Sequence, residues 1–284
     1  MTVVFREAEF YVRECGGRVQ CRLCPHNCKL APGQTGLCGV RQNQEGRLIS
    51  RNYGRITSLA LDPVEKKPLH HFYPGHLILS VGSFGCNLAC DFCQNWEISQ
   101  AAPPTQSLSP AALASAVEQA GADCIGVAYT YNEPLVWYEF VLEAAQLVQE
   151  QGYRNVLVTN GFIQREPLER LLPFIDAANV DLKGFNQRFY ARVCRGELAA
   201  VKATIERLLA AGLHVEITTL IIPGQNDALE ELEALYRWVG GLSADIPVHI
   251  NRYFPAFRRT TSATPPATLA RAAEIAARYL NYVY

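Results

Sequence analysis

From about residue 77 onward, short apolar runs alternate with segments whose apolar residues recur every three or four positions. The first pattern is typical of buried strands and the second of amphipathic helices. Gly121, Gly152 and Gly212 each stand where a helical segment should end, shortly before an apolar run. The pattern predicts strands over 77–83, 124–130, 155–159, 179–182, 213–222 and 247–251, and helices over 109–120, 134–151, 166–172, 198–211, 228–239 and 267–279.

Helices that end in glycine just before an apolar strand are typical of repeated βα units with a parallel sheet. Six such units follow one another, and 281–284 is predicted as one more short strand. Six units are fewer than the eight that close a TIM barrel. We therefore expect an α/β fold, a partial (β/α)6 TIM-like barrel over residues 77–284. A doubly wound open sheet is the alternative.

Residues 1–76 differ in character and are expected to form a small cysteine-rich N-terminal extension. They are rich in cysteine, glycine, asparagine and arginine, with short strand-like pieces over 47–51 and 55–61. No low-complexity tract or long linker separates them from the barrel. The charged run over 61–72 would, taken alone, be a solvated loop.

Composition indicates a globular protein with a sizeable core, because 49% of the 284 residues are hydrophobic and 19% are charged. A net charge of −1 creates no overall field that would gather nucleic acid or an anionic membrane. No apolar run approaches the roughly 18 residues that span a bilayer. The first residues carry charges where a signal peptide is apolar. We expect a cytoplasmic protein that binds neither nucleic acid nor membrane.

Eight of the ten cysteines lie within the first 93 residues. In a reducing cytosol, clustered cysteines bind metal or act in catalysis more often than they form disulfides. Cys124 and Cys194 stand apart from the clusters, and we expect them to be small buried side chains.

The segment 85–95 places Cys86, Cys90 and Cys93 at the spacing Cys-x3-Cys-x2-Cys, directly after the first barrel strand. Four thiolates would fill the protein-ligand positions of an ordinary [4Fe–4S] cluster. Three leave one iron open, where an amino acid can chelate through its amine and carboxylate. A sulfonium such as S-adenosylmethionine, held at such a cluster, accepts one electron and yields a 5′-deoxyadenosyl radical. The alternative is a zinc site or a set of structural thiols.

This spacing, with the aromatic Phe92 before the third cysteine, resembles the signature of the radical S-adenosylmethionine (radical SAM) superfamily. The resemblance implies a [4Fe–4S] cluster and S-adenosylmethionine as cofactors. It also implies an electron donor such as flavodoxin or ferredoxin.

Polar residues follow each of the six predicted barrel strands. In a parallel βα barrel the active site lies at the carboxyl ends of the strands. Helix capping would explain one such group, such as Asn132-Glu133-Pro134, but six in succession favour a ligand site.

The resemblance assigns roles to several of these polar residues. Glu133 stands in the loop that, in the superfamily, binds the amino group of S-adenosylmethionine. Here Tyr131-Asn132 replaces the family's Gly-Gly pair, so the part that Asn132 takes is less defined. Asn95, two residues after Cys93, matches a polar residue beside the cluster in activating enzymes.

Further strand-end residues complete the expected cofactor site. Asp181 and Lys183 match the Asp-x-Lys of activating enzymes, where the pair contacts the cofactor or nearby substrate, and Lys183 can pair with the cofactor carboxylate. Asn160 and Thr218 are expected beside the cofactor as well. His249 is either a contact to cofactor or substrate or a structural histidine.

A second group of thiols comprises Cys21, Cys24, Cys28 and Cys38. Four thiolates suit a tetrahedral zinc ion that would staple a region lacking its own core. They suit an auxiliary Fe–S cluster for electron relay equally well, and a site without metal is the third alternative. His26 and Cys15 are substitute ligands.

Taken together, these runs resemble one subgroup over the whole chain, the AmmeMemoRadiSam system radical SAM enzyme, which is close to the pyruvate formate-lyase activating enzymes. Members of that subgroup usually continue past a segment like 282–284 with a tail that carries more cysteines, so we expect the present chain to be shortened.

Two functions follow as hypotheses. The first is an activating-enzyme-like oxidoreductase that cleaves S-adenosylmethionine and then abstracts hydrogen from a substrate, which would be a small molecule or a glycine in a partner protein. The second is a non-catalytic Fe–S or zinc module for redox relay or docking, which leaves the six polar strand ends unexplained.

Overall fold

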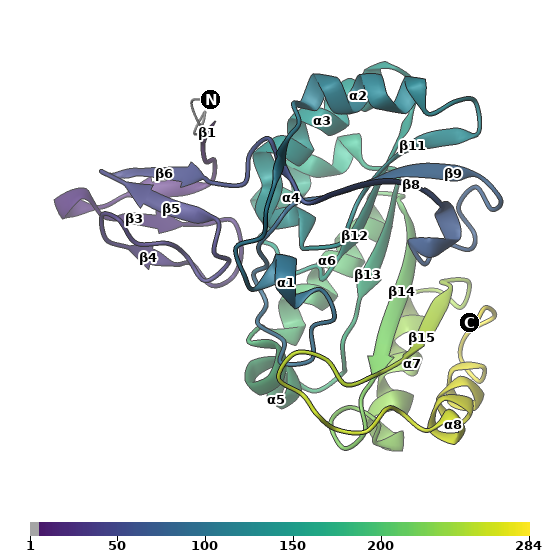
Figure 1. The fold of residues 1–284 in the computed structure, drawn as a ribbon. Coiled ribbons are helices and arrows are strands. Elements are labelled where there is room, and N and C mark those ends of the chain that lie inside the picture. Colours follow the sequence, from purple (N-terminus) through teal and green to yellow (C-terminus); the bar gives the residue numbers. More distant parts are fainter. Residues whose placement is uncertain (1–5) are drawn as a thin grey trace.

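The structure is a computed structural model that describes residues 6–284. Its centre is a seven-stranded sheet that curls into an open half-barrel (Figure 1). The strands run in the order β15-β14-β13-β12-β11-β9-β8. Their bounds are β8 Ser58–Pro63, β9 Leu77–Gly82, β11 Cys124–Tyr129, β12 Arg154–Thr159, β13 Ala177–Asp181, β14 His214–Ile221 and β15 Val248–Arg252.

The strand order confirms the predicted partial barrel. Within the main sheet, the strands β9, β11, β12, β13, β14 and β15 follow one another along the chain, and each pairs in parallel with the next. A doubly wound sheet would instead reverse its order at a switch point. The six strands predicted from the apolar runs are all present, and β8 adds an antiparallel strand at the β9 edge.

Helices follow the parallel strands and cover the outer face of the sheet (Figure 1). Ser109 begins the first of them as predicted, because its hydroxyl accepts a hydrogen bond from the Ala112 amide at 3.1 Å and Pro110 occupies the first turn. The helices are α2 Pro110–Gln119, α3 Tyr138–Glu150, α4 Arg165–Leu171, α6 Leu198–Ala210, α7 Leu229–Leu242 and α8 Pro266–Ala276.

Several short elements were not anticipated from the sequence. After β13 the chain forms α5 Gln187–Phe189 and a π-helical turn, η5 Tyr190–Cys194. The predicted strand over 281–284 is a single parallel bridge between Val248 and Val283. The remaining helical turns are η1 Cys15–Gly17, η2 Val64–Lys66, α1 Trp96–Ser99, η3 Pro134–Trp137 and η4 Leu172–Phe174.

The cysteine-rich N-terminal segment projects to one side of the half-barrel (Figure 1). It contains two small antiparallel sheets, β1-β6-β5 and β2-β3-β4. β7 then pairs with β10, and β8 joins the main sheet, so this segment is connected to the barrel through main-chain pairing. A domain boundary at 76/77 stays a prediction. The strands are β1 Arg6–Glu7, β2 Tyr11–Arg13, β3 Val19–Cys21, β4 Lys29–Leu30, β5 Arg41–Gln44, β6 Arg47–Ser50, β7 Arg55–Ile56 and β10 Gln106–Ser107.

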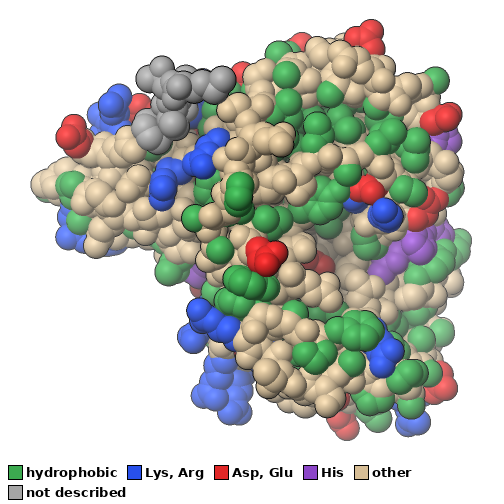
Figure 2. Space-filling model, viewed as in Figure 1, with side chains coloured by type: hydrophobic (Ala, Val, Ile, Leu, Met, Phe, Trp, Pro, Cys, Tyr) green, Lys and Arg blue, Asp and Glu red, His purple; other side chains and the backbone are tan. Residues whose placement is uncertain are grey.

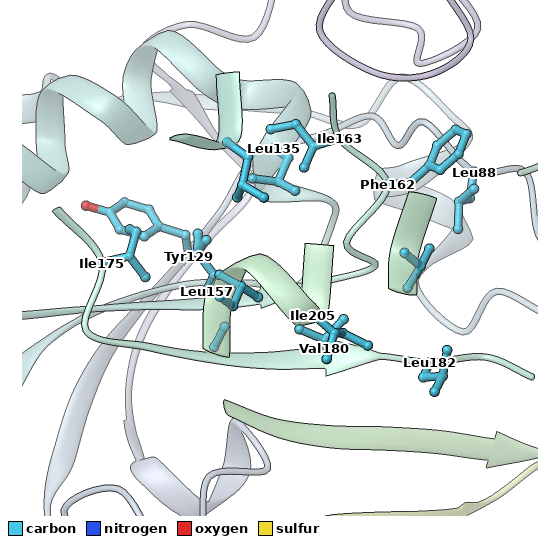
Figure 3. Close-up of a cluster of buried hydrophobic side chains, with 14 of the residues drawn as sticks. Leu88, Tyr129, Leu135, Leu157, Phe162, Ile163, Ile175, Val180, Leu182 and Ile205 are labelled. Atoms are coloured by element: carbon cyan, nitrogen blue, oxygen red, sulfur yellow. The ribbon is translucent and has the colours of Figure 1, made fainter. Parts of the chain in front are cut away.

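The hydrophobic core lies between the sheet and its helices and reaches the cysteine loop after β9. Figure 3 shows Leu88 of that loop beside Phe162, which follows β12. Both side chains are buried, so this part of the loop is anchored in the core. Among residues 6–284, none of the helices has the length and apolar character needed to cross a membrane.

Candidate active site

A cavity of about 350 Å³ lies at the carboxyl ends of the strands. Side chains from loops far apart in the sequence line it, as expected for a βα barrel. Every predicted cofactor residue except His249 contributes to its wall. Those lining residues are Cys86, Cys90, Phe92, Cys93, Asn95, Asn132, Glu133, Asn160, Asp181, Lys183 and Thr218.

The three thiols of Cys86, Cys90 and Cys93 share this cavity. The Cys86 sulfur accepts hydrogen bonds from the Leu88 amide at 3.4 Å and from Asn160 Nδ2 at 3.6 Å. Within residues 6–284, no three Cys, His, Asp or Glu side chains converge on a point where one ion would sit. Each thiolate of a [4Fe–4S] cluster binds a different iron, so a cluster does not require that convergence.

The N-terminal segment holds the cysteine loop from outside. Gly85, directly before Cys86, has φ of +90°, and a Cβ there would lie 2.7 Å from the Cys38 carbonyl oxygen. Only glycine combines that backbone conformation with that close approach. Next to Cys86, the Asn87 carbonyl oxygen is hydrogen-bonded to His26 Nε2 at 2.8 Å.

Cys194 lies against the cluster motif. It is buried as expected, and its carbonyl oxygen accepts a hydrogen bond from the Ala89 amide at 2.9 Å. A hydrogen bond with the Cys194 side chain, together with burial, raises the pKa of Cys90 well above its usual range. The contact was not foreseen, because nothing in the spacing of Cys194 links it to the triad.

Glu133 is a buried carboxylate held in place by three hydrogen bonds. They come from Thr159 Oγ1 at 2.6 Å, the Leu135 amide at 3.0 Å and the Asn160 amide at 2.8 Å. Burial outweighs these bonds and raises the pKa of Glu133 to about 7. In the described part of the chain, no Lys, Arg or His side chain forms an ion pair with it. The site therefore presents a buried acid without a counter-ion.

Asn132 braces the loop that carries Glu133. Its Oδ1 accepts from the Ser83 amide at 2.9 Å, and its Nδ2 donates to the Gly85 carbonyl oxygen at 3.0 Å. These bonds join the ends of β9 and β11. Tyr131 precedes it in the left-handed conformation, with φ of +71°, which glycine adopts without strain. The Tyr131-Asn132 pair therefore combines a left-handed turn at Tyr131 with side-chain hydrogen bonds from Asn132.

A charged group from the N-terminal side completes the cavity and was not singled out from the sequence. The Tyr131 hydroxyl donates to Asp62 Oδ2 at 2.9 Å, and Lys67 Nζ donates to the same oxygen at 2.8 Å. Burial raises the pKa of Asp62, but the hydrogen bonds from Lys67, Lys66 and Tyr131 outweigh it and lower that pKa. The sequence signal was the charged run 61–72, whose lysines line the cavity instead of facing only solvent.

Lys183 and Asp181 form an ion pair of 3.0 Å at the cavity wall. Burial works against the charge of Lys183, yet the charge of Asp181 and its hydrogen bond with Lys183 raise the Lys183 pKa. The Thr218 hydroxyl donates to Asn179 Oδ1 at 2.9 Å, so it faces the cavity with its proton already engaged.

His249 lies outside the cavity wall, in a separate polar group within the barrel. Its Nε2 is hydrogen-bonded to Glu216 Oε2 at 2.6 Å, and Glu216 also accepts from the amides of His70 and His71. Burial raises the pKa of Glu216, but its bonds with His214, His249 and these amides lower it to about 2. The geometry favours the structural role among the two predicted for His249.

The second thiol group surrounds a smaller cavity, lined by Cys21, Cys24, Cys28 and Cys38 together with His26 and Arg41. Burial raises the pKa of Cys24 above its usual range. Arg41 is buried, pairs with Glu139 at 2.5 Å, and has an Nε that meets no partner among the described residues. Cys15 is exposed and does not line the cavity.

Comparisons with known proteins identify the family and the fold. The family described as the Radical SAM superfamily matches residues 80–239. An uncharacterized protein of Methanocaldococcus jannaschii, MJ0808, is 40% identical over 285 residues, covering 98% of this chain and 84% of that protein.

Two further proteins are more distant. The benzylsuccinate synthase activating enzyme of Thauera aromatica is 30% identical over 122 residues, covering 43% of this chain and 37% of that enzyme. Among solved structures, a radical SAM methyltransferase from Sphaerobacter thermophilus superposes with a TM-score of 0.58 at 20% identity. That match covers 75% of this chain and 67% of the other, and it shows a shared fold.

Proposed function

The chain belongs to the radical SAM superfamily, and we propose that its cavity binds a [4Fe–4S] cluster and S-adenosylmethionine and cleaves the latter reductively. When bound, the cluster would supply the single electron for reductive cleavage of S-adenosylmethionine, and the cleaved cofactor would provide the radical for hydrogen abstraction. The observation that carries the proposal is that three thiols and the unpaired buried carboxylate of Glu133 line one cavity.

The donor set fits these cofactors. Cys86, Cys90 and Cys93 offer three thiolates, and no fourth cysteine of residues 6–284 lines the cavity. One iron would thus be free for the amine and carboxylate of S-adenosylmethionine. Loss of the thiol protons would accompany cluster binding, since metal ligands bind as thiolates.

Glu133 would take the ammonium group of S-adenosylmethionine. A carboxylate has about four acceptor positions, and three protein donors occupy part of this set. A cation at the remaining position would favour the ionised form of Glu133 and offset the effect of burial on its pKa. Thr159 and Asn160 hold the carboxylate in orientation.

Lys183 would face the carboxylate of the cofactor or a polar group of the substrate. Its pairing with Asp181 fixes the ammonium at the wall, and the buried setting strengthens a charge-assisted bond. Phe92 packs beside Phe189 with ring centroids 6.3 Å apart, and this contact holds the cysteine loop against α5.

The similarity to the Thauera aromatica activating enzyme favours a second, narrower function, hydrogen abstraction from a glycine of a partner protein. This similarity covers 122 residues. The glycine substrate is therefore a second proposal, which depends on the proposed cleavage of S-adenosylmethionine. A small-molecule substrate is the competing outcome.

We also infer that Cys21, Cys24, Cys28 and Cys38 hold a metal centre, either an auxiliary Fe–S cluster or a zinc ion. A zinc ion would have to draw the thiols together on binding, because they do not converge on one point among the described residues. Support comes from their shared cavity and from the unpartnered Arg41 Nε, a donor for a thiolate. Metal analysis of the purified protein and of Cys24→Ser separates the two. Zinc that is present in the native protein and absent from the variant indicates a structural zinc ion. A lower iron content in the variant, with the iron of the Cys86, Cys90 and Cys93 cluster retained, indicates an auxiliary Fe–S cluster.

The reconstituted protein, reduced with dithionite and given S-adenosylmethionine, tests the first proposal by its release of 5′-deoxyadenosine. We expect release with the native chain and weaker S-adenosylmethionine binding in Glu133→Gln. Cluster assembly without any 5′-deoxyadenosine would instead support the non-catalytic redox or docking module.

A further inference from the structure

The strap, a loop of residues 253–264, connects β15 to α8 and reaches across to the cysteine loop (Figure 1). β15 is one edge strand of the open main sheet, and β9, which precedes the cysteine loop, is the last strand but one at the other edge. The strap begins at the carboxyl end of β15, so it spans the open side of the half-barrel at the level of the cofactor cavity. Figure 2, drawn from the same side, shows the surface hollowed between the strap and the strands β8 and β9.

The two ends of the strap are fixed to each other and to the sheet. The Thr264 amide donates to the Tyr253 carbonyl oxygen at 3.1 Å, and the Tyr253 amide donates to Thr264 Oγ1 at 3.1 Å. The Thr264 hydroxyl in turn donates to the carbonyl oxygen of Ile221, the last residue of β14, at 2.5 Å. Both Tyr253 and Thr264 are buried. The base of the strap is therefore anchored, and its tip is the part that contacts the cysteine loop.

An ion pair with two parallel hydrogen bonds joins the tip to the cysteine loop. Arg259 Nε donates to Asp91 Oδ1 at 3.0 Å, and Arg259 Nη2 donates to Asp91 Oδ2 at 2.7 Å. The Arg258 amide also donates to the Asp91 carbonyl oxygen at 3.0 Å. The Arg259 side chain is only 11% exposed, so this pair is better shielded from water than an ordinary surface ion pair. The Tyr253 hydroxyl holds Arg259 from behind, through its carbonyl oxygen at 3.1 Å.

A second contact is aromatic. Phe257, at the tip of the strap, stacks on Trp96 with ring centroids 5.3 Å apart and an interplanar angle of 15°. Phe257 has φ of +55°, a conformation that a bulky side chain keeps only where its surroundings hold it. Trp96 begins α1 three residues after Cys93, and Asp91 lies two residues before Cys93. The two contacts of the strap therefore hold the cysteine loop on both sides of Cys93.

We propose that Arg259 is a positioning residue for the cluster site: through Asp91 it clamps the cysteine loop and keeps Cys90 and Cys93 in place. The inference rests on the proposed function, in which these two thiols are cluster ligands. None of residues 253–264 lines the cofactor cavity, so the strap acts through the cysteine loop and does not touch the cofactor itself. Release of the strap would let the loop open locally more often and expose bound iron to solvent.

Removing the ion pair from either end tests the clamp. R259M and D91N each break it, and the matched control R154M breaks the 3.0 Å ion pair with Asp176 at the amino end of β12. Loss of iron from the reconstituted protein to a chelator is followed by absorbance. We expect R259M and D91N each to lose iron about three- to tenfold faster than the native chain. D91N/R259M should be no faster than either single variant, since the two residues share one interaction. R154M should stay within about twofold of the native rate.

Urea unfolding separates positioning from general stability. The midpoint should shift no more in R259M than in R154M, because each variant loses one ion pair. R259K should recover part of the iron retention, since lysine keeps the charge but not the two parallel donors.

Acrylamide quenching of tryptophan fluorescence tests the clamp in the cluster-free chain. Trp137 is buried and Trp238 is half-buried, whereas Trp96 is 37% exposed, so Trp96 responds most to the quencher. Quenching should increase in R259M and stay at the native level in R154M.

Three outcomes overturn the proposal: unchanged iron loss in R259M and D91N, additive effects in D91N/R259M, or unchanged quenching in R259M. A native chain that assembles no cluster contradicts the proposed function instead. The fluorescence measurement needs no cluster, so the two failures are distinguishable.

Discussion

The Nδ2 of Asn160 lies 3.6 Å from the sulfur of Cys86, while the backbone amide of Asn160 donates to Glu133 at 2.8 Å. One residue at the end of β12 thus contacts both a proposed cluster ligand and the proposed ammonium acceptor. Its Oδ1 accepts from the Phe162 amide at 2.8 Å, which fixes the orientation of the side chain. The proposed cluster and cofactor sites are joined through this strand end.

Asn160→Ala should make the cluster harder to reduce. Removing a hydrogen bond to a cluster thiolate disfavours the added electron. We expect the midpoint potential to fall by tens of millivolts, on the order of a tenfold change in the reduction equilibrium per 59 mV. A potentiometric titration followed by EPR measures it. Thr218→Val, which lines the same cavity without a hydrogen bond to a thiol, is the control, and an equal shift there would contradict the role of Asn160.

Glu133→Gln should weaken S-adenosylmethionine binding without removing the cluster. A hydrogen bond to a charged group contributes about 1.5–3 kcal/mol, so Kd should rise roughly 10- to 100-fold. Calorimetry on the reconstituted protein gives Kd, and iron analysis gives cluster content. Unaltered affinity in this variant would remove Glu133 from the cofactor site.

The raised pKa of Glu133 makes the cofactor-free protein less stable as pH rises. The ordinary pKa of about 4.5 applies to the unfolded chain and about 7 to the folded one. The unfolded state thus loses its proton first, and the free energy of unfolding should fall between pH 4.5 and 7, by at most about 3 kcal/mol. The pKa of Glu216 is lowered to about 2, so its contribution to the free energy of unfolding rises with pH instead. That rise takes place mainly between pH 2 and 4.5, below the range in which Glu133 acts. Urea unfolding of native and Glu133→Gln proteins at pH 5 and 7 measures the difference, which should shrink in the variant.

Gly85→Ala should disrupt the cysteine loop more than a glycine substitution in open space. The new Cβ would meet the Cys38 carbonyl oxygen at 2.7 Å and Val40 at 2.6 Å, in a backbone conformation that alanine disfavours. Gly152→Ala, with φ of +83° and no atom within 4 Å, is the matched control and should cost about 1–2 kcal/mol of unfolding free energy. Gly85→Ala should cost several kcal/mol and reduce cluster content. Equal effects of the two substitutions would show that the contact with the N-terminal segment is not what fixes Gly85.

The parallel strands and the cavity-lining residues could be predicted because both follow from local order. Apolar runs indicate the six parallel strands β9 and β11 to β15, and residues directly after parallel strands must meet at one edge of the sheet. Glu133 and Lys183 were found in that way.

Contacts between distant segments could not be read from the sequence. The hydrogen bond of Tyr131 to Asp62 spans 69 positions, and the approach of Cys194 to Cys90 depends on the π-helical turn that ends there. His249 was predicted as a site residue by the same strand-end argument as Glu133. Its Nε2 is instead hydrogen-bonded to Glu216 on the neighbouring strand at 2.6 Å, inside the barrel. Side-chain partners that arrive from other strands decide such cases, and local patterning does not contain them.

The most direct test of the central claim is release of 5′-deoxyadenosine from S-adenosylmethionine by the reconstituted, dithionite-reduced protein, compared among three chains. The native chain and Cys124→Ala, which removes a buried thiol outside the cavity, should release it at similar rates. Cys90→Ala should release none, because a proposed cluster ligand is lost. Equal release by Cys90→Ala, or none by the native chain with its iron in place, would contradict the assignment of the triad.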